Sequence, residues 1–179
     1  MPEHATDLSL IIAAAVFAAE RHRDQRRKDA GASPNINHPL ALADILINEG
    51  GVNDAAVIAA ALLHDTVEDT QTTLAELTER FGPMIAGFVA EVSDDKTLSK
   101  AERKRLQVVH AAHASPAAKL VKLADKIANL RDLAASPPAD WSAQRKADYA
   151  IWAGEVVAAL RGINPALEAA FDAAAARLA

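Results

Sequence analysis

The segment LLHDTVED at positions 62–69 ends an apolar run in a dense group of titratable side chains. His64 and Asp65 offer an imidazole and a carboxylate, and a second acid follows each of them after four positions. Because residues i and i+4 share a helical face, we expect His64 to pair with Glu68 and Asp65 to pair with Asp69. Crowded carboxylates repel one another unless water, a proton or a cation offsets them, and a divalent ion does so most strongly. These eight residues alone are equally compatible with a metal site and with a solvated helix end.

Histidine is the other residue type in the chain that could hold a metal. There are six of them: His4, His22, His38, His64, His110 and His113. His38, in the segment INHP, lies at a predicted helix entrance, where its side chain either projects into a cleft or serves as a plain cap. We expect His110 and His113 at the surface, near the end of a charged helix, and His4 in a frayed tail.

Two further segments carry charge at suggestive spacing. In KLADKIANLRDL, four polar residues fall at steps of 3, 4 and 3 and form one helical stripe beside an apolar one: Lys122, Asp125, Asn129 and Asp132. Such a stripe is ordinarily the solvated face of a helix, so its periodicity does not assign Asp125 a ligand. The basic run from Arg21 to Lys28 is compatible with a polyphosphate cradle, a basic helix end or a nucleic-acid patch.

The composition indicates which elements position these side chains. The chain has 179 residues, 51% of them hydrophobic and 24% charged, and it is poor in glycine, proline and aromatic residues, which favours helices. Helix-breaking and capping residues divide it into about nine helical segments without a convincing strand between them. We therefore predict an all-α fold in a single domain over residues 1–179.

Local signals set several helix boundaries. Thr73 with Glu76 and Ser99 with Glu102 have capping-box spacing, and Asn53 can cap the helix that carries the apolar run VIAAALL. Ser115-Pro116 opens a long helix that the segment SPPAD at 136–140 stops. Other predicted helices span Leu8 to about Arg23, Pro39 to Gly50, Trp141 to Leu160 and Pro165 to the C-terminus.

Composition also excludes several kinds of protein. No cysteine is present, which excludes a disulfide scaffold, a thiolate metal site and a thiol nucleophile. The apolar stretch 8–19 is too short for a membrane span and lacks the flanks of a signal peptide, so we expect a cytoplasmic protein without membrane attachment. The net charge of −5 and the few aromatic residues argue against nucleic acid as a partner. A homo-oligomer is compatible with the sequence but is not specified by it.

Several separated motifs together resemble the HD-domain metal phosphohydrolases, and within them the small stand-alone, animal-type (p)ppGpp hydrolases of the Rel/Spo group. The motifs appear in the same order in this chain: FAAERHRDQRRKD, INHP, ALLHDTVEDT, EVSDDKTLSKAERKRLQ, KLVKLADKIANLRDL and WSAQRKADYAIWA. The dipeptide HD alone is a weak signal. HDxxED with an upstream NHP and a downstream KLADKxxNLRDL is a strong one, and the resemblance runs from about residue 8 to beyond residue 170.

The resemblance implies a role for several residues. His38, His64, Asp65 and Asp125 match the four metal ligands, which in this family usually hold Mn2+, although the ligand set itself suits several divalent ions. Glu68 and Asp69 match the acid pair that orients and deprotonates the attacking water. Nucleotide contacts are implied for Arg27, Lys28, Asn129, Arg145 and Tyr149. An aromatic residue is common in the family where this chain has Asn35, a change expected to weaken packing near the nucleotide.

The resemblance implies hydrolysis of the 3′-pyrophosphate of ppGpp or pppGpp, without a synthetase activity. Two alternatives stay open at this point. The same metal site could remove the 2′-phosphate of NADPH, as animal-type relatives resemble enzymes that do so, or the chain could be a non-catalytic nucleotide sensor. The sequence does not distinguish a phosphate on the ribose 2′ oxygen from one on the 3′ oxygen.

Overall fold

The computed structural model describes residues 6–178, so His4, which we expected in a frayed tail, lies outside the described residues. The described residues confirm the all-α prediction. Within residues 6–178 there are ten α-helices and one π-helical segment, and the only strand-like pairing is an isolated bridge between Arg26 and Pro34. Their bounds are α1 Asp7–His22, α2 Asn37–Asp44, η1 Ile45–Glu49, α3 Ala55–Leu63, α4 Thr66–Asp69, α5 Leu74–Phe81, α6 Pro83–Val92, α7 Lys100–Ala111, α8 Pro116–Ala135, α9 Ala143–Ala158 and α10 Pro165–Ala175.

Helix α3 is the centre of the core. All nine of its residues are buried, as expected for a helix that is apolar on every face. It packs against α1, α2, α6 and α8. Its alanines lie against these neighbours on all sides, and small side chains allow helices to approach closely. This enclosed helix therefore carries the residues that follow Leu63 to a fixed place inside the molecule.

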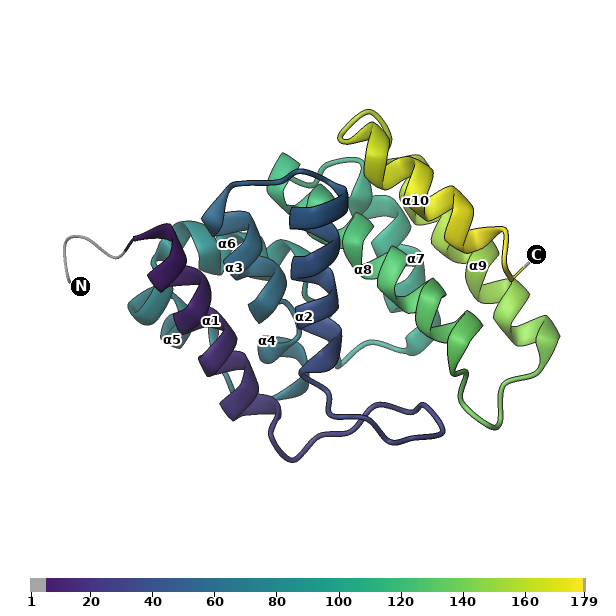
Figure 1. Ribbon diagram of the computed structural model, residues 1–179, viewed down its shortest axis with the longest axis horizontal. Helices are drawn as coiled ribbons and strands as arrows, with labels where there is room; N and C mark the ends of the chain where they lie inside the picture. The colour runs from purple at the N-terminus through teal and green to yellow at the C-terminus, as the bar shows by residue number, and fades with distance from the viewer. Residues whose placement is uncertain (1–5, 179) are drawn as a thin grey trace.

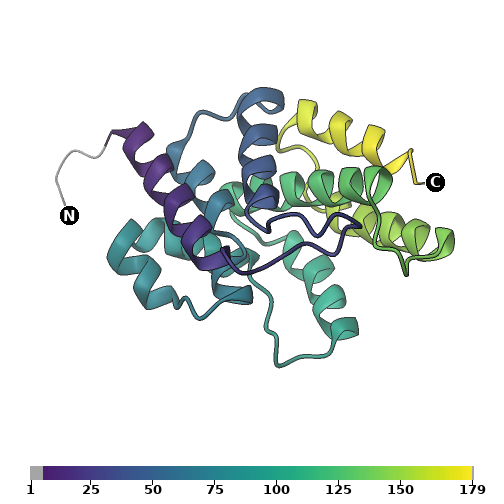
Figure 2. The ribbon, with the colours of Figure 1, turned by 60° about the horizontal axis from the view of Figure 1, so that its bottom comes forward.

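Helix α8 joins the two sides of the molecule. It contacts α2, α3 and α6 on one side and α9 and α10 on the other, and the two described chain ends lie at opposite ends of the structure (Figure 1). Its apolar residues Leu123, Ile127 and Leu130 are completely buried. The loop between α1 and α2 extends across to α8 (Figure 2). There, Arg27 donates to Asp132 at 2.7 Å. Residues from the first and last thirds of the chain thus meet at α8.

The predicted starts of three helices are confirmed, the two expected capping boxes form only by their hydroxyl half, and one expected cap is wrong. The hydroxyls of Thr73, Ser99 and Ser115 accept from backbone N–H groups at the starts of α5, α7 and α8. The expected cap Asn53 is wrong, because the Asp54 carboxylate accepts from the Ala56 N–H instead. A carboxylate caps a helix N-terminus as well as an amide does, so the two adjacent candidates were equivalent by residue type.

Among residues 6–178, none of the helices is long and apolar enough to cross a membrane. The single domain over residues 1–179 stays a prediction.

Candidate metal centre and adjoining cavities

The chain turns sharply at the end of α3, and this turn creates the site. His64 is the C-cap residue of α3 and Asp65 is the N-cap residue of the short α4, so α3 and α4 are two separate helices. The open carbonyls of α3 are satisfied by side chains: His64 Nδ1 lies 2.7 Å from the Ala61 carbonyl, and the Thr66 hydroxyl donates to the Leu63 carbonyl at 2.7 Å. Among the described residues His64 therefore lies against Asp65 and Asp125 and not against Glu68, so that expected pair is wrong. Asp65 and Asp69 do share the turn of α4, where the Asp69 N–H donates to the Asp65 carbonyl at 2.8 Å.

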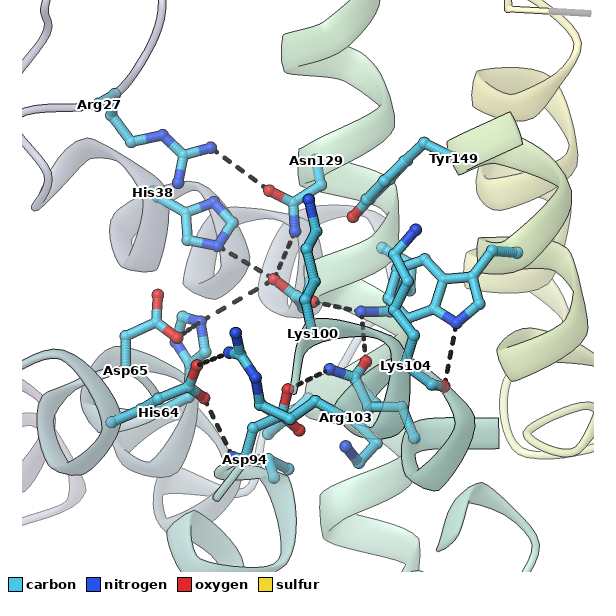
Figure 3. A pocket seen from close by; sticks show the side chains of 18 residues that line it. Arg27, His38, His64, Asp65, Asp94, Lys100, Arg103, Lys104, Asn129 and Tyr149 are labelled. Carbon is cyan, nitrogen blue, oxygen red and sulfur yellow. Dashed lines mark hydrogen bonds and ion pairs between the residues drawn. The ribbon is translucent and has the colours of Figure 1, made fainter. Parts of the chain in front are cut away.

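Four predicted ligands from three parts of the chain converge beside this turn, and Figure 3 labels three of them, His38, His64 and Asp65. One ligand atom from each of His38, His64 and Asp65 lies within 4.8 Å of the other two, which makes this group a possible metal site. Asp125 of α8 joins them, with its Oδ1 3.0 Å from His38 Nε2 and 3.9 Å from His64 Nε2. His38 is on α2, and both imidazoles are buried.

The hydrogen bonds of His64 fit metal ligation. When Nδ1–H donates to the Ala61 carbonyl, the lone pair of Nε2 is directed into the cluster. Nε2 is buried and has no hydrogen-bond partner among the described residues, although Asp65 Oδ1 is 3.0 Å away in an unsuitable direction. A buried acceptor without a donor is costly unless something else binds it. Two imidazoles and two carboxylates form a donor set suited to a divalent transition metal.

The charges in the cluster are strongly coupled. Burial opposes the imidazolium of His64, but the adjacent Asp65 and Asp125 carboxylates outweigh burial and raise the pKa of His64 to about 9. Burial likewise opposes ionisation of Asp65, yet His64 lowers its pKa to about 2. The pKa of Asp125 is held well below its usual range, against burial, by Lys126 and His38. The two carboxylates thus stay ionised, and without a metal the proton on His64 supplies the positive charge between them. A divalent ion that binds here takes the place of that proton.

The acid pair of the motif lies at the edge of the cluster. Glu68 accepts from the Asp94 N–H at 3.0 Å and has Lys96 and Arg103 at 3.5 and 3.9 Å. Burial raises the pKa of Glu68, and nearby carboxylates add to this, which suits a group that must accept a proton. Asp69 forms an ion pair of 2.5 Å with Lys96.

Two cavities meet at the cluster. The first, of about 290 Å³, is lined by His64, Asp65, Glu68 and Asp125, and the second, of about 780 Å³, is lined by Asp69. Both are bordered by Arg27, His38, Asn129 and Tyr149. Together they offer the volume and polar lining of a small-molecule site. The candidate metal ligands therefore lie where the two cavities adjoin.

The predicted nucleotide contacts divide between these cavities and the surface. Arg27 donates to Asn129 at 3.3 Å on their shared border, and Lys28 lines the second cavity. Burial raises the pKa of Tyr149 to about 12, so its hydroxyl stays protonated and can donate. Arg145 is exposed and lines neither cavity; its guanidinium lies 4.3 Å from the centre of the Trp141 ring. Trp141 itself lines the second cavity.

The first cavity is surrounded by basic side chains that the sequence did not indicate as a group. Besides Arg27 they are Lys100, Arg103, Lys104, Lys122 and Lys126. The three on α7 occur at steps of 3 and 1, which places them on one helical face. That spacing, in the segment KAERKR, could have indicated them. The polar stripe on α8 faces the cavities through Lys122, Asp125 and Asn129, so it is not a solvated face.

A second polar group that the sequence did not reveal supports the acid pair from behind. Gln25 Nε2 donates to the Asp69 carbonyl at 2.6 Å, and Gln25 Oε1 is 2.7 Å from Nδ1 of the buried His22. Asn35 lines the second cavity and its Nδ2 donates to Gln25 Oε1 at 3.4 Å. Where the family commonly has an aromatic residue, this chain thus has an amide that hydrogen-bonds to this group.

The remaining candidates are structural or superficial. His110 and His113 are exposed, as predicted. In the basic run, Arg21 pairs with Glu76 of α5, and Arg23 pairs with its neighbour Asp24 at 3.2 Å. The run therefore does not form one continuous patch, and within it Arg26, Arg27 and Lys28 line the second cavity.

Comparison with known proteins agrees with this geometry. The family model described as HD domain matches residues 14–163, so the chain belongs to the HD-domain family. Two relatives named guanosine-3′,5′-bis(diphosphate) 3′-pyrophosphohydrolase MESH1 are similar over nearly their full length. The Xenopus tropicalis protein is 58% identical over 167 residues, covering 93% of each chain. The human protein is 54% identical over 165 residues, covering 92% of each chain.

Solved structures extend the comparison to the fold. A structure described as a metazoan orthologue of SpoT that hydrolyses ppGpp superimposes with a TM-score of 0.90 at 44% identity, covering 96% of this chain and 95% of the other. A Listeria monocytogenes protein of 30% identity superimposes with a TM-score of 0.62, covering 79% of this chain and 95% of the other. The resemblance to small hydrolases of the Rel/Spo group is thereby confirmed.

Proposed function

We propose that this protein is a metal-dependent hydrolase that removes the 3′-pyrophosphate of ppGpp or pppGpp, giving GDP or GTP and pyrophosphate, with Mn2+ as its cofactor. The observation that carries the proposal is the convergence of His38, His64, Asp65 and Asp125 at the junction of two cavities, with Glu68 beside them. The names of the relatives in Xenopus and human support the same substrate. The cytoplasmic location stays a prediction.

In this proposal His38, His64, Asp65 and Asp125 would hold the metal, which would supply a positive charge able to lower the pKa of a water and to polarise the attacked phosphate. Glu68 orients the water and takes its proton, a role suited to a carboxylate whose pKa is raised by burial. Asp69 assists it from the border of the second cavity.

The substrate is positioned by the side chains between the cavities. Arg27 and Lys28 offset the charge of the nucleotide phosphates, and Asn129 and Tyr149 offer an amide and a protonated hydroxyl on the shared border. We place Arg145 near the nucleotide only through its stacking on Trp141, because it lines neither cavity.

The test is a direct assay of the purified protein. It would be stripped of metal, reloaded with Mn2+ or left empty, and followed for pyrophosphate release from ppGpp. A parallel reaction with NADPH would be followed for phosphate release. We expect Mn2+-dependent release of pyrophosphate from ppGpp. No release with any divalent metal would refute the proposal, and turnover of NADPH alone would move the activity to the ribose 2′ position.

Gln25 provides a prediction about the acid pair. Replacing it with Leu removes the donor to the Asp69 carbonyl at nearly constant volume. One hydrogen bond contributes about 1 kcal/mol, so kcat for ppGpp should fall by roughly fivefold while bound metal is unchanged. Gln144→Leu, at an exposed glutamine on α9, is the matched control. An unchanged kcat in the Gln25 variant would show that this contact does not position Asp69.

A further inference from the structure

Lys122 is a buried residue whose ammonium group faces the first cavity without a direct partner among the described residues. Only 7% of its surface is exposed, it lines the first cavity, and within residues 6–178 no carboxylate lies within 4 Å of its ammonium group and no hydrogen bond satisfies it. Its neighbour one turn further, Lys126, is fully engaged: its Nζ donates to Asp125 at 3.0 Å and to Gln107 at 2.9 Å. Of two buried lysines on α8, one thus has direct polar partners for its ammonium group and the other has none, and burial alone does not explain this difference.

Two partly buried cations on α7, Arg103 and Lys104, also line the first cavity. The buried Nε of Arg103 has no partner among the described residues, and its Nη1 is 3.9 Å from Glu68. Lys104 lies over the rings of Trp152 and Tyr149, without a carboxylate within ion-pair distance in the described part of the chain. Burial lowers the pKa of Lys122 and of Lys104, and neighbouring cations lower both further. Carboxylates beyond ion-pair distance act in the opposite direction, those of Asp94, Asp125 and Glu68 on Lys122 and that of Asp148 on Lys104. An anion bound between the two lysines would reverse the lowering of both pKa values.

The residues that line the two cavities indicate which part of a nucleotide substrate would supply the anion near Lys122. The second cavity is the larger, and it is lined by the aromatic Trp141 with Lys28 and Asn35, which suits a nucleoside. The candidate ligand His38 borders both cavities. A phosphate attacked at this border has its ribose on the side of the second cavity, so a group attached beyond that phosphate enters the first cavity.

We propose that Lys122, with Arg103 and Lys104, forms a binding subsite for the distal phosphate of a pyrophosphoryl group on the ribose, an inference that rests on the proposed function. In the reaction, the water oxygen bonds to the proximal phosphorus and the bond from that phosphorus to the ribose oxygen breaks. The electron pair leaves with the ribose oxygen, which takes up a proton. The released pyrophosphate retains both phosphates, and Lys122 neutralises the distal one throughout.

The experiment compares two substrates that differ only in the distal phosphate: ppGpp and the nucleotide with a single phosphate on the 3′ oxygen. Lys122→Met removes the charge and keeps an unbranched side chain. We expect kcat/KM for ppGpp to fall by about tenfold or more, as for loss of one charge-assisted hydrogen bond, and that for the 3′-monophosphate to change by less than about threefold. Lys119→Met, on the same helix but outside both cavities, is the control.

Thermal unfolding separates binding from a structural role. Because Lys122 is buried and unpaired, Lys122→Met should unfold at the same temperature as the wild type or above it, whereas loss of a structural contact would lower it. If this variant fails to fold, kcat/KM for the same two substrates would be compared in Lys104→Met, which also lies in the lining of the first cavity. Equal losses on both substrates, or none on ppGpp, would overturn the subsite. Absence of wild-type hydrolysis would instead overturn the proposed function.

Discussion

Asp125→Asn is expected to abolish metal retention and to reduce hydrolysis of ppGpp by roughly 10³-fold. The Asp125 carboxylate faces both candidate imidazole ligands, with Oδ1 at 3.0 Å from His38 and 3.9 Å from His64. An amide has nearly the same shape but no charge, so the cluster loses one of the two anions that attract a cation. Loss of a metal that provides several kcal/mol of transition-state stabilisation corresponds to a rate change of this size.

The measurement has two parts, metal content after dialysis against Mn2+ and pyrophosphate release. Asp148→Asn, an exposed aspartate on α9, is the matched control and should retain both properties. Asp125 also pairs with the buried Lys126, so folding of the variant should be checked by circular dichroism. His64→Gln provides a second ligand substitution that leaves this pair in place. A folded Asp125 variant that binds Mn2+ in wild-type amount and keeps its turnover would contradict the assignment.

Much of the fold was accessible from local signals. The absence of strand patterns predicted the all-α class, and hydroxyl residues before α5, α7 and α8 predicted those helix starts, because a cap depends only on residues within one turn. The second half of each capping box is not seen. Glu76 instead pairs with Arg21 of α1, and Glu102 pairs with Arg105 on its own helix. Charged side chains at helix ends thus took partners that the cap pattern did not specify.

The helix break inside HDTVED was not accessible in this way. A four-residue spacing describes a continuous helix, whereas here the side chains of His64 and Thr66 satisfy the last carbonyls of α3 and allow the chain to turn. That turn places Glu68 near Arg103 and Asp94, residues more than 25 positions later in the chain. Such contacts depend on the packing of α3 and α6 and leave no periodic signal in the sequence.

The polar stripe of α8 shows a second limit. Lys122 and Lys126 have the same residue type and adjacent turns, yet one is paired with Asp125 and Gln107 and the other is not. Hydrophobic periodicity distinguishes an apolar stripe from a polar one, but it does not distinguish a solvated polar face from one that lines a cavity. The family motif supplied Asp125 and Asn129, and only the three-dimensional arrangement identified Lys122.

The double replacement Glu68→Gln and Asp69→Asn should leave metal binding nearly intact and lower turnover by about 10²- to 10⁴-fold, the contribution of a positioned general base. Both amides keep the shape of the acids, and the amide oxygen introduced by Glu68→Gln can still accept from the Asp94 N–H. Neither acid belongs to the group of His38, His64 and Asp65 that could hold a metal. Glu102→Gln on α7, at a partly exposed acid that pairs with Arg105, is the control for loss of a carboxylate.

The pH profile of the single variants identifies which acid takes the proton. Burial raises the pKa of Glu68 above its ordinary value of 4.5, so kcat/KM of the wild type should fall as the pH drops through an apparent pKa above 4.5. If Glu68 is the base, Asp69→Asn should have lower activity overall but the same fall of kcat/KM at low pH. Glu68→Gln should lose most of the activity, and what remains should no longer show that fall. Retention of that fall in Glu68→Gln would transfer the role to Asp69. Unchanged turnover in the double variant would exclude both residues as the base, because no carboxylate of the pair would then remain to accept the proton.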